Sequence, residues 1–198
     1  MIIKQDIKKV IDAINLGKIV AIKTDTVYGL VCDANNVEAC AKIYKIKRRD
    51  KKKPLAIFIK NIDEVKKYVL NSELSTELVN IMEKYWPGPL TIIFKKKNNV
   101  FEHLTEGTNT IGIRIPNDKF LLDILNNIDS PLAQTSCNIS GEEEYKNVIE
   151  IEAKLGTKVD LIVDGGEIKN TLASTIISIE ENKIKVIREG TIKINELY

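Results

Sequence analysis

Three short segments of this chain place hydroxyl, amide and cationic side chains where a rigid scaffold could present them to a ligand. The first segment spans 23–30 and reads Lys-Thr-Asp-Thr-Val-Tyr-Gly-Leu, directly after an apolar run at 19–22. Its hydroxyl groups could hold a small polar molecule, because functional side chains gather on loops that a scaffold supports. The alternative is an ordinary turn in which the threonine hydroxyls bond to their own backbone.

The second segment is a basic stretch at 45–55, between a helical pattern and an apolar strand pattern. Arginine binds phosphate oxygens through two parallel hydrogen bonds and lysine supplies a point charge, so this junction suits a polyphosphate. Two alternatives stay open. A charge run is commonly a solvated face, and a patch that binds an RNA backbone needs the same charges.

In the third segment, Ser136, Asn138 and Ser140 alternate with Cys137 and Ile139. An extended backbone would point the three polar side chains to one side and Cys137 to the apolar side. The pattern alone is weak, since polar turns are common. Arg114 is a further candidate, because it alternates with Ile113 and Ile115 and so should face opposite the apolar side. The others are Ser174-Thr175 and Arg188-Glu189-Gly190, and for each candidate the alternative is an ordinary surface residue.

The signatures of several other enzyme classes are missing. The sequence contains no G-x-x-x-x-G-K-[ST], G-x-G-x-x-G, H-E-x-x-H or G-x-S-x-G motif. His103, the single histidine, lies in a polar stretch without a nucleophile motif, so we interpret it as a loop residue and not as a general base. Cys32, Cys40 and Cys137 lie too far apart for a zinc motif, which predicts buried reduced thiols and no structural metal.

Hydrophobic patterns predict the helices and strands that must position these segments. Apolar residues at the i, i+3, i+4, i+7 spacing predict helices over 7–14, 37–44, 78–85 and 121–128, with Asp118 as the cap of the last. Short β-branched runs predict strands at 19–22, 55–59, 90–94, 111–115, 161–163, 174–179 and 184–187. Some of these strands follow helices and others follow short turns, so a mixed sheet covered by helices is expected.

The composition is typical of a globular protein, and the length is that of a single domain. The 198 residues are 43% hydrophobic and 29% charged, and 30 basic against 28 acidic residues leave a net charge of +2, which says little about partners. No apolar run approaches the roughly 20 residues of a membrane span, and the first ten residues interleave lysine with isoleucine. We therefore expect a cytoplasmic protein that does not bind membranes.

The order of the motifs along the chain is more informative than any one of them. Seven motifs follow one another: Thr-Asp-Thr-Val-Tyr-Gly-Leu (24–30), Lys-x-Arg (47–49), Trp-Pro-Gly-Pro-Leu-Thr (86–91), Arg-Ile-Pro (114–116), Ser-x-Asn-x-Ser-Gly (136–141), Ser-Thr (174–175) and Arg-x-Gly (188–190). In this order and spacing they resemble the YrdC-type threonylcarbamoyl-AMP synthase family of the YrdC/YciO-like superfamily. The resemblance implies an α/β fold, a twisted open mixed sheet flanked by helices with a concave basic face. It also implies a single YrdC-like domain over residues 1–198, without the second domain of longer relatives.

The resemblance further implies a role for individual residues. The expected catalytic tetrad of the tRNA-modification branch is Lys47, Arg49, Ser136 and Asn138. The expected ATP-binding residues are Arg49, Lys53, Thr110, Ser136 and Arg188, and the expected threonine-binding residues are Thr26, Arg114 and Ser174. We expect variation among relatives at Asp25, Phe58 and Cys137, and alanine at Ser136 or Asn138 should slow turnover while leaving the melting temperature nearly unchanged.

The activity implied by the resemblance joins L-threonine, bicarbonate and ATP into threonylcarbamoyl-AMP, with magnesium accompanying the ATP. The intermediate would pass to threonylcarbamoyl-transferase proteins that modify tRNA, and direct contact with tRNA is left open. Such steps need positioning and charge stabilisation more than a protein nucleophile. Two rival functions remain: a relative that forms carbamoyl-AMP, and an RNA-binding module that uses the basic stretch at 42–53 without catalysis.

Overall fold

A computed structural model describes residues 1–105, 107–169, 172–180 and 183–196. Its strands form one open mixed sheet in the order β1-β8-β2-β3-β7-β4-β6-β5-β9-β10. The strands are β1 (Ile2–Lys4), β2 (Val20–Lys23), β3 (Tyr28–Asp33), β4 (Ala56–Phe58), β5 (Leu90–Lys95), β6 (Thr110–Arg114), β7 (Leu132–Ser136), β8 (Leu161–Asp164), β9 (Thr175–Glu180) and β10 (Lys183–Arg188). The sheet contains parallel pairs such as β4 with β6 and antiparallel pairs such as β3 with β7, which confirms the predicted mixed sheet.

The helices include all four that the hydrophobic spacing predicts. The α-helices are α1 (Ile7–Asn15), α2 (Val37–Lys47), α3 (Val65–Tyr68), α4 (Thr76–Tyr85), α5 (Glu102–Thr105), α6 (Lys119–Asn126) and α7 (Val148–Leu155). Single 3-10 turns occur at Ile62–Glu64, Asn71–Glu73 and Ile194–Glu196. Asp118 caps α6 as predicted, because its carboxylate accepts a hydrogen bond from the backbone N–H of Leu121 at 2.9 Å. Helices α3, α5 and α7 were not predicted.

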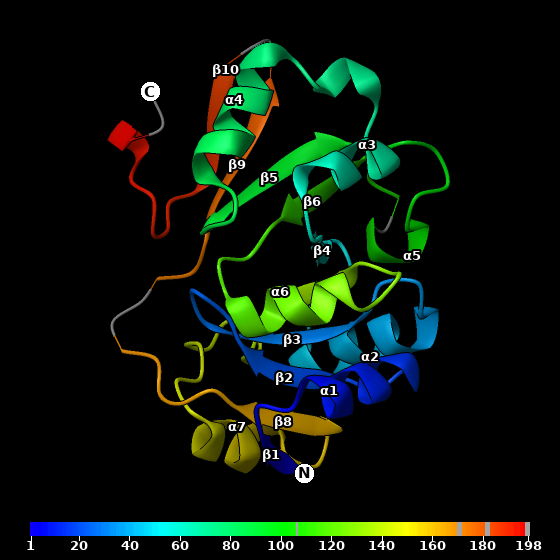
Figure 1. Cartoon of the computed structure of the whole chain (residues 1–198), viewed down its shortest axis with the longest axis vertical. Helices are drawn as coiled ribbons and strands as arrows, with labels where there is room; N and C mark the ends of the chain where they lie inside the picture. The colour runs from blue at the N-terminus through cyan, green and yellow to red at the C-terminus, as the bar shows by residue number, and fades with distance from the viewer. Residues whose placement is uncertain (106, 170–171, 181–182, 197–198) are drawn as a thin grey trace.

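The helices divide between the two faces of the sheet (Figure 1). On one face α1 and α6 lie side by side, and their buried residues, such as Ile14 and Leu125, pack with Ile22 and Phe58 of the sheet. The larger core on the other face takes its helical residues from α2, α4 and α7, among others. Ile113, Ala133 and Cys137 belong to this larger core. Because side chains alternate along a strand, Arg114, Gln134 and Ser136 point toward the α1 and α6 side. That side carries the candidate site.

Strands β1, β3 and β7 were not predicted. Strand β3 begins at Tyr28, inside the segment interpreted as a turn, and Tyr28 pairs with Lys23 of β2. The turn itself is therefore only 24–27. Strand β7 ends at Ser136, so this residue does lie on the extended backbone that its predicted orientation requires. Both strands lack a long β-branched run, which explains why the hydrophobic pattern did not reveal them.

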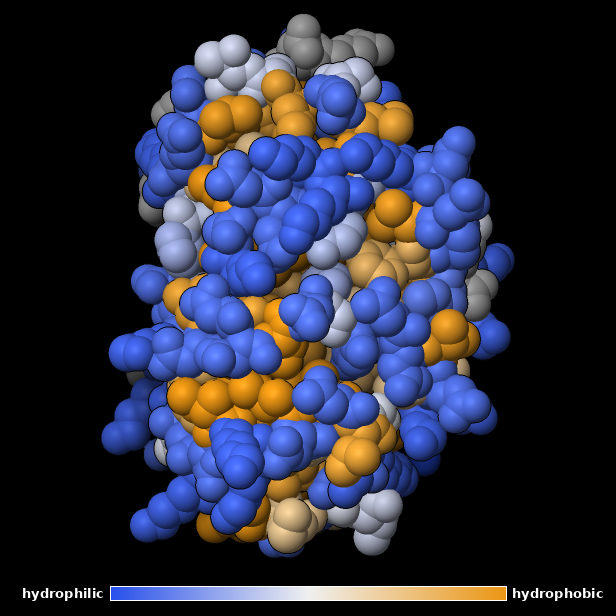
Figure 2. Space-filling model, turned by 45° about the vertical axis from the view of Figure 1, so that its right-hand side comes forward, coloured by the Kyte–Doolittle hydropathy of each residue, from blue (hydrophilic) through white to orange (hydrophobic). Residues whose placement is uncertain are grey.

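Hydrophilic side chains cover most of the face seen in Figure 2, and hydrophobic residues show between them in separate bands. None of the helices in the described ranges is long and apolar enough to cross a membrane. The three cysteines are free and buried, as the sequence predicts. Cys32 and Cys40 lie together in the core with their sulfur atoms 3.6 Å apart.

Candidate active site

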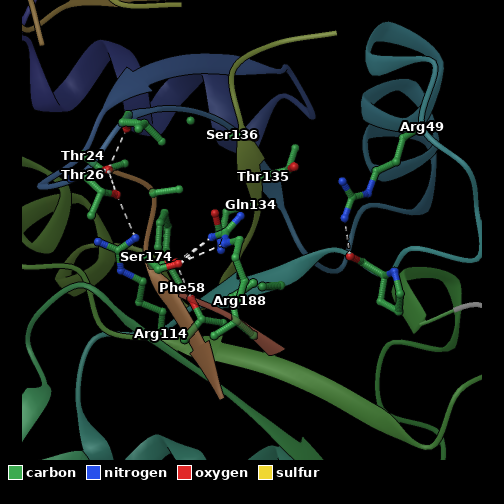
Figure 3. Close-up of a pocket in the computed structure, with 17 residues that line it drawn as sticks. Thr24, Thr26, Arg49, Phe58, Arg114, Gln134, Thr135, Ser136, Ser174 and Arg188 are labelled. Carbon is green, nitrogen blue, oxygen red and sulfur yellow. Dashed lines mark hydrogen bonds between the residues drawn. The ribbon is translucent and has the colours of Figure 1, made fainter. Parts of the chain in front are cut away.

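A pocket lies on the sheet face shared with α1 and α6 (Figure 3). It is lined by Thr24, Thr26, Val27, Gly29, Arg49, Pro54, Ala56, Phe58, Thr91, Arg114, Gln134, Thr135, Ser136, Ala173, Ser174, Ile176 and Arg188. Within the described chain, this lining includes three arginines and several hydroxyl groups but no carboxylate. The pocket therefore suits a ligand with more than one negative charge.

The strand register explains why residues so distant in sequence meet here. Phe58 of β4 pairs with Arg114 of β6 on one side, and Thr91 of β5 pairs with Ile176 of β9 further along the same face. Between these rows lies the small residue Ala56, which lines the pocket and has Gly112 of β6 beside it. A Cβ atom on Gly112 would lie 3.1 Å from the Cβ atom of Ala56, so a side chain at this position would crowd Ala56.

Arg114 is buried at one end of the pocket and is held from several directions. Its Nε atom donates to the Gly88 carbonyl at 3.0 Å, Nη1 donates to Thr26 Oγ1 at 3.0 Å, and Nη2 donates to Asp25 Oδ1 at 2.5 Å. The guanidinium also lies over the Phe58 ring, 5.7 Å from its centroid. Burial lowers the pKa of Arg114, and the charge of Asp25 opposes that shift. These three bonds use three of its five N–H groups, which leaves two for a ligand carboxylate.

The Gly88 carbonyl reaches Arg114 because the Trp-Pro-Gly-Pro segment turns tightly. A Cβ atom on Gly88 would lie 2.4 Å from the Tyr85 carbonyl oxygen, a distance that no other residue type tolerates. The Trp86 indole N–H anchors the same turn by donating to the Leu90 carbonyl at 2.7 Å. This motif therefore acts on the site through the orientation of Arg114.

The turn at 24–27 has features of both interpretations of the sequence, a loop that contacts a ligand and a turn held by its own threonine side chains. Thr24 Oγ1 donates to the Val27 carbonyl at 2.7 Å and accepts from the Thr26 backbone N–H at 3.1 Å, so the turn is held by its own side chain. Both threonines nevertheless line the pocket. Tyr28 does not line it. Its hydroxyl instead holds the loop after β8, donating to the Gly166 carbonyl at 2.8 Å and accepting from the Gly165 N–H at 3.1 Å.

Arg188 and Ser174 meet on another wall of the pocket. Arg188 Nη2 donates to the Ser174 carbonyl at 2.7 Å, and its Nε donates to the same oxygen at 3.2 Å. Ser174 Oγ lies 2.9 Å from Thr91 Oγ1. Thr175, by contrast, faces away and ties β9 to the turn at 190–192, where its Oγ1 donates to the Ile192 carbonyl at 2.7 Å.

Arg49 stands on the opposite side of the pocket from Arg114, at the right of Figure 3. Its Nε donates to the Lys53 carbonyl at 2.8 Å and its Nη2 donates to the Pro54 carbonyl at 3.0 Å. Burial lowers the pKa of Arg49. The contribution of Lys53 here is its backbone carbonyl, because its exposed side chain is not part of the pocket lining.

Lys47 is only 1% exposed and lies behind the pocket wall. Its ammonium group donates to the Ser136 carbonyl, to the Asn138 carbonyl at 2.8 Å and to Asn138 Oδ1 at 2.7 Å, which matches three donors with three acceptors. Burial, with a smaller effect from the charge of Arg49, lowers the pKa of Lys47 to about 8, so the group is still an ammonium at pH 7. Lys47 thus holds the 136–138 backbone in place.

Asn138 connects Lys47 to Ser136. Its Oδ1 atom accepts from Lys47 and from Ser136 Oγ, the latter at 2.8 Å, and its Nδ2 donates to the Glu142 carbonyl at 2.7 Å. Asn138 is buried and is not part of the pocket lining, whereas Ser136 is. Cys137 points into the core, as predicted, and burial raises its pKa to about 12. The expectation that Asn138→Ala would leave stability unchanged conflicts with these contacts.

We predict opposite consequences for Ser136→Ala and Asn138→Ala. Asn138→Ala removes one of three acceptors from a buried cation and should lower stability by about 1 to 3 kcal/mol, roughly 2 to 12 °C in melting temperature. Ser136→Ala should melt normally and turn over several-fold to tenfold more slowly, the usual effect of losing one neutral hydrogen bond. Ser140→Ala is the matched control, because Ser140 is exposed. Normal melting of Asn138→Ala would contradict its structural role.

The pocket brings together six of the residues that the resemblance singled out. These are Thr26, Arg49, Arg114, Ser136, Ser174 and Arg188. It does not include the side chains of Lys47, Lys53, Asn138 or Thr110. Thr110 begins β6 on the same face as Arg114, about 13 Å away at strand spacing. Sequence reasoning offered the hydroxyl groups of the 23–30 segment, Thr24 among them, as ligand contacts, and it included Thr91 in the 86–91 motif without a role. It did not single out Gln134, whose place on this face follows from strand register.

Within the described chain, the basic lining, the hydroxyl groups and the open α/β sheet define a small-molecule site for anions. The chain belongs to the Sua5, YciO and YrdC family, whose model, described as "Telomere recombination", matches residues 12–190. A relative from Methanocaldococcus jannaschii is 42% identical over 181 residues, which cover 91% of this chain and 84% of the relative. The threonylcarbamoyl-AMP synthase of Aliivibrio fischeri is 31% identical over 173 residues, which cover 87% of this chain and 93% of that protein.

The fold also matches a solved structure. The Sua5 protein of Pyrococcus abyssi complexed with L-threonine superposes with a TM-score of 0.91 at 28% sequence identity. The match covers 100% of this chain and 59% of that one, so this chain corresponds to little more than half of the Pyrococcus protein. The comparisons establish family and fold, while the binding role of each pocket residue stays a prediction.

Proposed function

We propose that this chain is an L-threonylcarbamoyladenylate synthase, which forms threonylcarbamoyl-AMP and pyrophosphate from L-threonine, bicarbonate and ATP. The observation that carries the proposal is the pocket that combines Arg49, Arg114 and Arg188 with hydroxyl groups and, in its described lining, no carboxylate. All three substrates are anionic or carry a carboxylate, so three cations in one pocket suit them. Relatives named threonylcarbamoyl-AMP synthase support the same activity.

The reaction needs positioning more than a protein nucleophile. The threonine amine attacks the carbon of bicarbonate, a C–N bond forms, and water leaves to give N-carboxythreonine. A carboxylate oxygen of that species then attacks the α-phosphorus of ATP, and the bond to the β-phosphate oxygen breaks to release pyrophosphate. Holding three reactants in line accounts for a large share of such a rate enhancement.

The two ends of the pocket suggest how the reactants are arranged. Arg114 and Thr26 would hold the threonine carboxylate, because Arg114 keeps two N–H groups and is fixed by Asp25 and Gly88. Arg49 and Arg188 would neutralise the phosphates, and Ser136 would contact the same nucleotide. Ser174, which contacts Arg188 and Thr91, would border the threonine.

Magnesium would accompany ATP in this proposal. No group of three His, Cys, Asp or Glu side chains in the described ranges could hold a metal ion, and Asp25 beside the pocket is paired with Arg114. The residues around the pocket therefore do not form a protein-built magnesium site, and the ion would be held by phosphate oxygens and water. Its charge would help to neutralise the triphosphate.

The product would serve the threonylcarbamoyladenosine modification of tRNA, with threonylcarbamoyl-transferase proteins as the next users and the cytoplasm as the expected location. The RNA-binding alternative rests on the exposed side chains of Arg48, Lys51, Lys52 and Lys53 beside the pocket. Arg49 argues against a purely solvated basic run, because it folds back onto the Lys53 and Pro54 carbonyls at the pocket edge.

A pyrophosphate-release assay separates these functions. We expect release from ATP that needs both L-threonine and bicarbonate and stops when either is omitted. Release that needs carbamoyl phosphate in place of threonine and bicarbonate would identify a carbamoyl-AMP-forming relative. No release under either condition, together with salt-sensitive binding of tRNA, would identify the RNA-binding module.

A further inference from the structure

Gln134 is a polar residue in the middle of the pocket floor that the sequence motifs do not single out. It lies on β7, where it pairs with Val31 of β3 on one side and with Ala56 of β4 on the other. Figure 3 shows its amide among the labelled pocket residues, with Arg49 set apart from it on the right. It is one of two glutamines in the chain.

The side-chain amide of Gln134 has no hydrogen-bond partner in the described part of the chain. Two charged side chains in the same pocket lining have partners within the protein: Arg114 bonds to Asp25, and Arg188 bonds to Ser174. In the described ranges, every fully buried side-chain nitrogen or oxygen has a hydrogen-bond partner. Because the Gln134 amide has none and the residue is only half-buried, the amide is exposed to the solvent in the pocket. An amide that lines a pocket without a hydrogen-bond partner in the described part of the protein can bind a ligand.

The position of Gln134 lies between the two ends of the site. Ser136 follows it by two residues on the same face of β7, about 7 Å along the strand. Toward the other end, its neighbour Ala56 precedes Phe58 by two residues, and Phe58 lies under Arg114. Ala56, the partner of Gln134 on β4, is small, and both residues line the pocket.

We propose that Gln134 is a further catalytic residue, whose amide N–H donates to the carboxylate of N-carboxythreonine during its attack on ATP. This inference rests on the proposed function. One carboxylate oxygen forms the new bond to the α-phosphorus while the pyrophosphate oxygen leaves with the bonding electrons. The other oxygen needs a donor that fixes the plane of the carboxylate, and a neutral amide supplies one without adding charge.

The test compares Gln134→Met, Gln134→Glu and Gln134→Ala with the wild type in the pyrophosphate-release assay. Methionine keeps the length of the side chain and removes the donor, so kcat should fall about three- to tenfold, the effect of one hydrogen bond. Glutamate keeps the shape and places a negative charge against an anionic intermediate, so kcat should fall further than with methionine. Calorimetric dissociation constants for L-threonine and for ATP should stay within about twofold for Gln134→Met, because the donor acts on the intermediate.

Gln5→Glu is the matched control, since Gln5 is exposed near the amino end and the substitution adds the same charge. Its kcat should equal that of the wild type, and the melting temperatures of Gln134→Met and Gln134→Ala should stay close to the wild-type value. Unchanged kcat in folded Gln134→Met and Gln134→Glu would overturn the inference. Weaker threonine binding at unchanged kcat would also overturn it, because Gln134 would then be a ground-state contact.

The same experiment separates the inference from the function on which it rests. If wild-type protein releases pyrophosphate only with both L-threonine and bicarbonate, the proposed function stands and the Gln134 variants decide the role of this residue alone. If the wild-type protein shows no such dependence, the proposed function fails, and the role of Gln134 in that reaction fails with it.

Discussion

Arg49→Ala should lower kcat/KM for pyrophosphate release by roughly 30- to 1,000-fold, which corresponds to about 2 to 4 kcal/mol of lost transition-state stabilisation. The reason is preorganisation: the Lys53 and Pro54 carbonyls fix the guanidinium in place before the substrates arrive. Because the cation is already in position, little free energy is needed to reorient it during the reaction, and it stabilises the charge that develops on the phosphates. Steady-state kinetics with ATP as the varied substrate measures the effect.

The neighbouring arginine supplies the control. Arg48 is exposed and ends α2 in the left-handed conformation at φ 49°, so Arg48→Ala removes the same charge from the same loop without touching the pocket. It should leave kcat/KM nearly unchanged. Arg49→Lys should be nearly as slow as Arg49→Ala, because lysine lacks the planar fork that bonds to two carbonyls and still faces the pocket. A folded Arg49→Ala protein with near-normal turnover would show that Arg49 only shapes the loop.

The parts of the site that a single sequence can predict are those whose position follows from local pattern. Arg114 was expected to face away from Ile113 and Ile115, and it does, since both isoleucines belong to the core on the other face. Ser136 and Cys137 were expected to point to opposite sides, which is also confirmed. In each case strand alternation fixes the direction of the side chain.

The parts that could not be predicted depend on which strands become neighbours. Gln134 carries no local signal that distinguishes it from a surface residue, and the motif at 86–91 includes Thr91 without giving it a role. The place of both residues in the pocket follows from pairings between strands far apart in sequence. Lys47 gives the opposite example. A lysine in a basic run is usually solvated, and only the tertiary structure shows it enclosed by the carbonyls of 136 and 138.

Asp25 was expected to vary among relatives, and in this chain it is the ion-pair partner of the most buried arginine in the pocket lining. Arg114 is 3% exposed, while the Asp25 carboxylate lies 2.5 Å from its Nη2. The carboxylate therefore does two things at once. It compensates a charge that burial disfavours, and it sets the direction of the guanidinium that would receive the threonine carboxylate.

Asp25→Asn should consequently be the most destabilising substitution around the pocket. It keeps the shape of the side chain and leaves the Arg114 cation buried without its counter-charge, which costs about 3 to 5 kcal/mol when one partner of a buried pair is removed. For a chain of this size the melting temperature should fall by roughly 6 to 20 °C at pH 7. Thermal unfolding followed by circular dichroism measures this fall.

A surface ion pair provides the matched comparison for Asp25→Asn. Asp63 lies 3.8 Å from Lys66 with its side chain 90% exposed, so Asp63→Asn makes the same chemical change where water screens the charge, and its effect should stay within about 0.5 kcal/mol. The double variant Asp25→Asn with Arg114→Met should recover part of the stability that Asp25→Asn loses, because no unpaired charge then remains in the interior. Equal, small shifts for Asp25→Asn and Asp63→Asn would mean that water reaches Arg114 freely, and Asp25 would then have no role in fixing the guanidinium for threonine.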